Sequence, residues 1–135
     1  MGSGSGAGQH ILVVDDEPGI REIMTQALRK EGHSVTEASD GVEALALFSN
    51  NPFDLVITDF ELPGMKGDEL VEKVRRLVPG QRIIMVSGAW PEFGSPLPKV
   101  DFCLDKPFQL TELVVAVRYV VQDISFTKTD SAAVQ

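Results

Sequence analysis

The sequence predicts an α/β protein in which a parallel β-sheet carries helices on both faces. Four short apolar runs, each ending on a polar or charged residue, are typical of strands buried on both sides. These runs are Ile11–Asp16, Leu55–Asp59, Ile83–Ser87 and Asp101–Lys106. Most of the segments between them repeat apolar residues with a helical period of about 3.6. Alternating strands and helices form right-handed βαβ units, which build a parallel sheet.

Length, composition and charge exclude several classes of protein. With 135 residues and 43% hydrophobic content, the chain can bury one core, so we expect one domain. A net charge of −8 argues against nucleic-acid binding, because duplex affinity depends on Lys and Arg. No apolar stretch approaches the roughly 20 residues of a membrane span. The single cysteine, Cys103, is expected to be a small buried core residue and fits a reducing, cytoplasmic environment.

The two ends of the chain are expected to lie outside the fold. Residues 1–8 are rich in Gly and Ser and lack the basic and apolar regions of a signal peptide, so we interpret them as a flexible leader. Residues 124–135 have no periodicity, and we expect a flexible tail. Residues 9–123 are therefore the predicted domain.

The first half of the domain is expected to contain two helices. Pro18 suits the first turn of a helix and Gly32 suits its end. The apolar residues on one face of this helix are Ile20, Ile23, Met24, Ala27 and Leu28. After a weak strand at 34–38, Asp40 and Glu43 have the spacing of a capping box. The inward-facing residues of this second helix are expected to be Val42, Leu45 and Phe48.

The second half continues the alternation with one interruption. A turn-rich loop at 62–67 precedes a third helix, whose apolar side comprises Leu70, Val71, Val74, Leu77 and Val78. The last helix has the clearest pattern, with Leu110, Leu113, Val114, Val117, Val120 and Val121 on one side. Residues 88–100, by contrast, hold three prolines and two glycines. We predict a loop with at most one helical turn there, because proline removes a donor and clashes with the preceding turn.

Chemically useful residues stand where the predicted strands end. Asp15, Asp16, Asp59, Ser87 and Lys106 all occupy such positions. In open α/β sheets the binding crevice lies outside the carboxyl ends of the strands, so these side chains are expected to meet. Three carboxylates would repel one another without a cation, and hard oxygen ligands suit Mg²⁺, which shares its remaining positions with phosphate. The pattern therefore favours phosphoryl-group chemistry.

At these residues the chain resembles the receiver domain of two-component response regulators, within the CheY-like superfamily. The motifs that carry the resemblance are Val13–Pro18, Asp59–Gly67, Val86–Ala89 and Asp105–Phe108. The resemblance implies a flavodoxin-like, three-layer fold with a five-stranded parallel sheet in the order 2-1-3-4-5. Against the family pattern, the fourth helix is expected to be degraded.

The resemblance also implies a role for each pocket residue. Asp59 matches the phosphoacceptor, and Lys106 would pair with the acyl phosphate. Ser87 would move toward the phosphoryl group as a conformational switch. The Mg²⁺ ligands would be Asp15, Asp16, Asp59 and the backbone carbonyl of Glu61. The bond between Lys106 and Pro107 is commonly cis in the family.

Function, partners and location follow from the same resemblance. The donor would be a sensor histidine kinase or a histidine phosphotransfer protein, and the recipient of the signal an unspecified output domain or protein. The domain would act in the cytoplasm as a signalling phosphoacceptor and not as an enzyme. Two alternatives stay open: a pseudo-receiver that binds partners without a phosphorylation cycle, and an Asp-nucleophile phosphohydrolase. The phosphohydrolase is disfavoured because no second Asp follows Asp59 at the second position and no cap insertion is present.

Two departures from the family concern the output of the domain. Cys103 occupies the position three before Lys106, where the family usually has an aromatic residue that changes rotamer with the switch. The proline-rich segment 88–100 replaces much of the fourth helix, which contributes to the common dimer face of the family. We therefore hypothesise that output does not use a dimer through that face, and the oligomeric state stays open.

Overall fold

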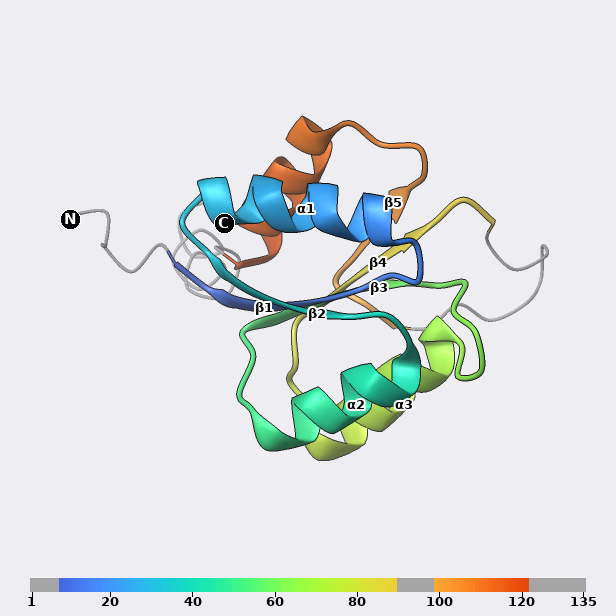
Figure 1. The fold of residues 1–135 in the computed structure, drawn as a ribbon. Helices are drawn as coiled ribbons and strands as arrows, with labels where there is room; N and C mark the ends of the chain where they lie inside the picture. The colour runs from blue at the N-terminus through green and yellow to red at the C-terminus, as the bar shows by residue number, and fades with distance from the viewer. Residues whose placement is uncertain (1–7, 90–98, 122–135) are drawn as a thin grey trace, which may run out of the picture.

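The computed structural model describes residues 8–89 and 99–121 and has three layers (Figure 1). In chain order the elements are β1 (His10–Val14), α1 (Pro18–Lys30), β2 (Ser34–Ala38), α2 (Gly41–Asn50), β3 (Leu55–Asp59), α3 (Gly67–Leu77), β4 (Ile83–Ser87) and β5 (Phe102–Asp105). Residues 110–121 form a further helix, here called the last helix. The five strands are parallel in the order β2-β1-β3-β4-β5, which confirms the predicted topology.

Some sequence-based expectations fall outside this part of the chain. The leader over 1–8 is described only at Gly8, and the tail over 124–135 is not described. The predicted loop over 88–100 and the hypothesis about the fourth helix concern mainly residues 90–98, which also lie outside the description. The domain limits 9–123 stay a prediction. Within the described residues, no helix has the length and apolarity needed to cross a membrane.

Burial on both faces explains why the strands lack polar alternation. β1 lies in the middle of the sheet, where Ile11 is in register with Val35 of β2 and with Leu55 of β3. Ile11 and Val13 belong to one core cluster and Leu12 and Val14 to the other, and all four are fully buried. Alternate residues of one strand therefore fill opposite cores, as expected for a parallel sheet between two helical layers.

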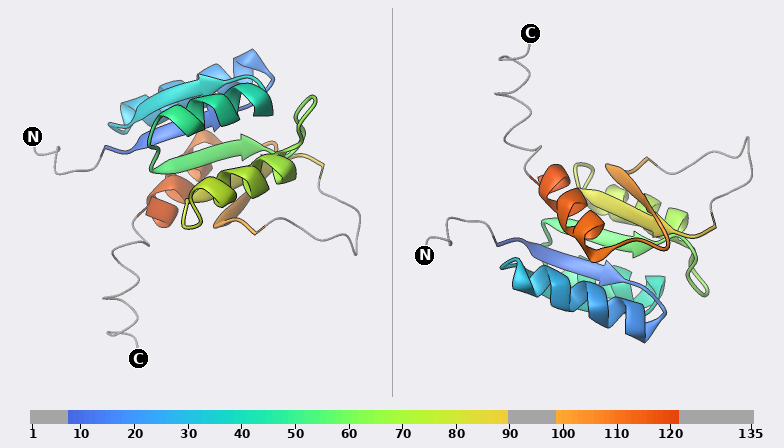
Figure 2. Two further views of the ribbon diagram at one scale, coloured as in Figure 1. Left: turned by 90° about the horizontal axis from the view of Figure 1, so that it is seen from below. Right: turned by 90° about the horizontal axis from the view of Figure 1, so that it is seen from above.

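The helices divide into two pairs. α1 and the last helix cover one face of the sheet, and α2 and α3 cover the other (Figures 1 and 2). The helix ends follow the predicted signals. Pro18 opens α1, Gly32 adopts a positive φ of 96° just after it, and the Asp40 side chain accepts a hydrogen bond from the Glu43 amide at 2.7 Å. These caps set where each helix begins and ends relative to the strand ends.

Two burial predictions, for Val42 and Cys103, were wrong, and other residues at the margins of the apolar helix faces are also exposed. Ile23, Val42 and Leu77 are 50%, 66% and 54% exposed, because a helix on a sheet buries only the centre of its apolar stripe. Cys103 is exposed and is not a core residue. It lies on the edge strand β5, where Leu104 faces the core and its neighbours Cys103 and Asp105 do not.

Candidate functional site

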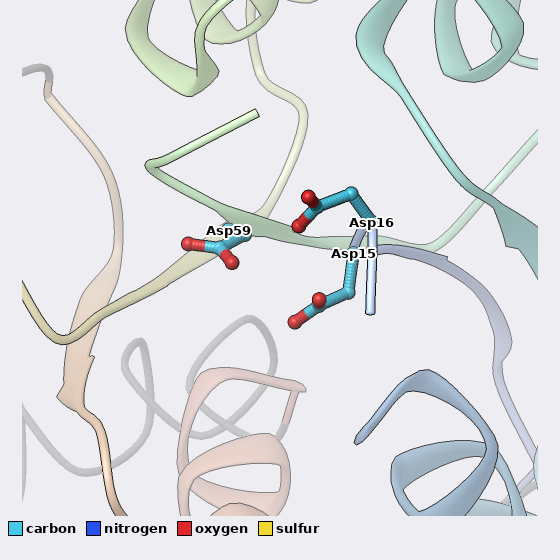
Figure 3. A group of neighbouring side chains, drawn as sticks. All are labelled: Asp15, Asp16 and Asp59. Carbon is cyan, nitrogen blue, oxygen red and sulfur yellow. The ribbon is translucent and has the colours of Figure 1, made fainter. Parts of the chain in front are cut away.

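Three carboxylates gather where β1 and β3 end. Asp15 and Asp16 directly follow β1, and Asp59 is the last residue of the neighbouring strand β3. Figure 3 shows the carboxylates of Asp15 and Asp16 extending toward the side on which Asp59 lies. One oxygen of each lies within 4.8 Å of the others. Asp15 and Asp59 are buried, whereas Asp16 is exposed.

A single ammonium group joins the two buried carboxylates. Lys106 follows β5, and its Nζ donates to Asp15 Oδ2 at 2.9 Å and to Asp59 Oδ2 at 2.8 Å. Glu17 Oε1 lies 3.7 Å from the same nitrogen. The Lys106 side chain is 17% exposed, so these are partly desolvated, charge-assisted contacts. Three strand ends that are far apart in sequence thus contribute to one charged cluster.

Backbone amides hold the remaining carboxylate oxygens. The Glu17 amide donates to Asp15 Oδ1 at 2.9 Å, and the Glu61 amide donates to Asp59 Oδ1 at 3.0 Å. Each buried carboxylate therefore has one oxygen on a backbone amide and one on the Lys106 ammonium. Protein groups alone therefore hold both carboxylates in place.

Burial and charge act in opposite directions on the ionisation of this cluster. Burial raises the pKa of Asp59 above its ordinary value, and the opposing Lys106 ammonium and Glu61 amide do not fully offset it. For Lys106, burial lowers the pKa, but the carboxylates of Asp59 and Asp15 outweigh it and leave the pKa raised. Lys106 therefore stays protonated, and Asp59 is a buried carboxylate paired with its ammonium.

A glycine allows the loop after β3 to fold back over Asp59. The Gly67 amide donates to the Phe60 carbonyl at 3.0 Å. A Cβ atom at Gly67 would overlap the Asp59 carbonyl oxygen and lie 2.8 Å from the Phe60 Cα. Only glycine permits this approach. The sequence indicated a turn here, but the contact with Asp59 is visible only in the structure.

The other predicted site residues occupy different positions around the opening. A cavity of about 280 Å³ is lined by Asp16, Glu17, Asp59, Glu61, Gly88, Ala89 and Lys106. Ser87 is fully buried at the end of β4, and its Oγ accepts a hydrogen bond from the Ala89 amide at 3.0 Å. Its carbonyl accepts from the Lys106 amide at 2.8 Å, and the Lys106–Pro107 bond is cis. Ser87 is thus buried next to the cavity-lining residues Gly88 and Ala89, and Glu61 itself lines the cavity.

The donor set suits a hard divalent cation. Three carboxylates without an intervening cation would repel, and among the described residues Lys106 is the one cation that forms an ion pair with the two buried ones. Asp16 is exposed beside the cavity, so a cation could enter from solvent. Oxygen-only donors with open positions fit Mg²⁺ better than softer metals. Asp15, Asp16 and Asp59 would hold it.

A known protein-family model matches most of the chain. Residues 11–118 match the family model described as response regulator receiver domain. The probable transcriptional regulatory protein TcrX of Mycobacterium tuberculosis is 32% identical over 126 residues, which cover 91% of this chain and 54% of TcrX. The chain thus spans about half the length of that curated relative.

Solved structures agree with this match. A CheY-like response regulator receiver domain protein of Methanospirillum hungatei JF-1 superimposes with a TM-score of 0.79 at 33% identity, covering 85% of this chain and 94% of that one. The response regulator TrrA of Thermotoga maritima, solved in complex with Mg²⁺ and BeF, has a TM-score of 0.75 at 37% identity. The coverage is 83% of this chain and 98% of TrrA.

Proposed function

This chain belongs to the response regulator receiver domain family, and on that premise we propose that Asp59 accepts a phosphoryl group from a phosphohistidine on a sensor kinase or phosphotransfer protein. The observation that carries the proposal is the position of Asp59, which is buried, lines the cavity and lies 2.8 Å from the Lys106 ammonium. A carboxylate in this setting can act as a nucleophile, and the Lys106 ammonium is already in place to offset the negative charge of the acyl phosphate that forms.

The chemical step is a displacement at phosphorus. An Asp59 carboxylate oxygen forms a bond to phosphorus while the P–N bond to the donor imidazole breaks, and the electron pair of that bond leaves with the imidazole. Lys106 neutralises charge on the phosphoryl oxygens, and the Glu61 amide continues to hold the other Asp59 oxygen. Bound Mg²⁺ would supply Lewis-acid stabilisation of the phosphoryl oxygens. We assign its ligands to Asp15, Asp16, Asp59 and the Glu61 carbonyl.

The rim beside the cavity favours a protein as the phosphoryl donor. Lys106 lines the acidic cavity and also a neighbouring apolar groove of about 370 Å³ between α1 and residues 106–110. Ile23 and Leu110 contribute exposed apolar side chains to this groove. A donor histidine must come within bonding distance of Asp59, so its carrier must cover this rim. We assign the groove to the histidine-bearing surface of the donor protein.

The output of the domain is a second part of the proposal. Ser87 would exchange its bond with the Ala89 amide for one to the phosphoryl group and so bias a two-state equilibrium. A partner or output domain would read the shifted population. The domain would act in the cytoplasm as a signalling phosphoacceptor without multiple turnover.

Mass measurement after incubation with Mg²⁺ and a small phosphodonor tests the proposal. We expect the protein to gain the mass of one phosphoryl group, as an acid-stable and base-labile adduct that Asp59→Asn abolishes. Glu61→Gln is a matched control, because it changes a neighbouring acid at the mouth while leaving its backbone in place.

The same experiment separates the alternatives. An absent adduct in the folded wild-type protein would favour a pseudo-receiver. Multiple turnover of a small phosphorylated substrate would favour a phosphohydrolase. Either result would reject the proposed function.

A further inference from the structure

Arg21 of α1 joins the end of β2 to the peptide that carries the first two acids of the site. Its Nε donates to Glu37 Oε1 at 2.9 Å, and its Nη1 donates to the Asp15 carbonyl oxygen at 2.6 Å. Both partners are partly buried, with side-chain exposures of 18% for Arg21 and 34% for Glu37. The sequence pattern gave this residue no role.

The Asp15 carbonyl lies just beyond the hydrogen bonds between β1 and β2. The Asp15 amide still bonds to the Ala38 carbonyl at 3.2 Å, but β2 ends at Ala38. The donor to the Asp15 carbonyl is therefore the Arg21 guanidinium and not a backbone amide of β2. A guanidinium is a rigid planar fork, so anchoring one edge on Glu37 fixes where the other edge lies.

Holding this carbonyl orients two carboxylate-bearing residues. The peptide bond is planar, so the Asp15 carbonyl and the Asp16 amide share one plane. Among the described residues, the Asp16 carboxylate has no partner that holds it, so the backbone sets where its Cβ points. Glu37 neutralises the guanidinium, so orientation and not added positive charge is the main contribution of Arg21 to the site.

We infer that Arg21 is a positioning residue for the cation site, acting through the Asp15–Asp16 peptide. This inference rests on the proposed function, because it takes the three carboxylates to be Mg²⁺ ligands. Groups that orient metal ligands from outside typically contribute a factor of about 10–100 to metal affinity. We expect Arg21→Met to weaken Mg²⁺ binding about 10-fold.

The chain offers a matched control on the same helix. Arg29 also joins α1 to β2: its Nη2 donates to the Val35 carbonyl at 3.0 Å, at the end of the sheet away from the acids. Arg29→Met therefore removes a comparable hydrogen bond between α1 and β2 but leaves the contacts of the carboxylates unchanged. Arg21→Lys serves as a rescue variant, since an ammonium can still reach the Asp15 carbonyl.

Isothermal titration with MgCl₂, combined with urea unfolding, tests the inference. The expected result is a roughly 10-fold weaker affinity for Arg21→Met, near-normal affinity for Arg29→Met and partial recovery in Arg21→Lys. The NMR signal of the Asp16 amide should shift in Arg21→Met alone. An unchanged affinity in Arg21→Met, or an equal loss in Arg29→Met, would overturn the inference.

Two further outcomes separate a failure of the proposed function from a failure of the inference about Arg21. A wild-type protein that binds no Mg²⁺ would reject the metal site of the proposed function, and the role of Arg21 with it. If Arg21→Met does not fold, Glu37→Ala removes the anchor of the guanidinium and should weaken Mg²⁺ binding by a smaller factor. Unchanged affinity in that variant would equally overturn the inference.

Discussion

Replacing Lys106 by methionine should destabilise the protein strongly in the absence of divalent cations. Methionine has a similar length and apolar stem, so the change removes mainly the ammonium group. Asp15 and Asp59, whose side chains are only 1% and 6% exposed, would then face each other without a counter-charge. Leaving one member of a buried ion cluster unpaired is among the few single changes with a large effect.

The size of the effect follows from the two contacts. At an effective dielectric constant of about 20, unit charges separated by the observed 2.8 Å and 2.9 Å attract by roughly 6 kcal/mol each. Desolvation of the ammonium cancels much of this, and breaking buried pairs costs about 3–5 kcal/mol net. Because Lys106 retains some solvent contact, we expect a loss of about 3 kcal/mol. In a domain of this size that corresponds to a fall in Tm of about 12 °C.

Urea unfolding at neutral pH, with and without Mg²⁺, measures this loss. Mg²⁺ should stabilise the variant more than the wild type, because the cation would replace the missing ammonium between the carboxylates. Lys73→Met is the control: Lys73 lies 3.9 Å from Glu69 on the surface of α3, and such pairs contribute about 0.5 kcal/mol or less. A loss below about 1 kcal/mol in Lys106→Met, or a loss that Mg²⁺ leaves unchanged, would refute the reasoning.

Two further predictions concern the loop after β3 and the end of the sheet opposite the site. Gly67→Ala should lower the free energy of unfolding by about 2 kcal/mol, measured in urea, and slow phosphorylation, because the added Cβ would displace the Asp59 carbonyl. A normal phosphorylation rate would contradict this prediction. Burial lowers the pKa of His33, whose Nδ1 accepts the Gln9 amide, so the folded state prefers the neutral ring. As pH falls below about 6.5 the unfolded state takes up the proton first, and stability should fall between pH 7 and 5. His33→Gln, which keeps an acceptor but cannot titrate there, should lose this part of the pH dependence; parallel wild-type and variant curves would contradict the assignment.

Much of the fold could be predicted because local signals agreed with one another. Uninterrupted apolar runs indicated buried parallel strands, and Pro18, Gly32 and Asp40 indicated helix ends, which the structure confirms. The errors occurred where burial depends on a neighbour. Periodicity identifies the apolar stripe of a helix but not its width, so Val42 was predicted to face inward and is 66% exposed. Cys103 was predicted buried, but an edge strand leaves it exposed.

For the candidate site, the sequence by itself determined which acids and which lysine would meet. Parallel strands present their carboxyl ends at one edge, so a residue that ends a strand has a known destination. The tertiary structure alone decided how they meet: Lys106 bridges Asp15 and Asp59, and Gly67 folds against Asp59. The metal role of Glu61 and the switching role of Ser87 stay predictions. The physical reason for the division is range. Strand ends follow from local patterns and topology, whereas contacts between side chains from separate elements depend on the packing of the whole domain.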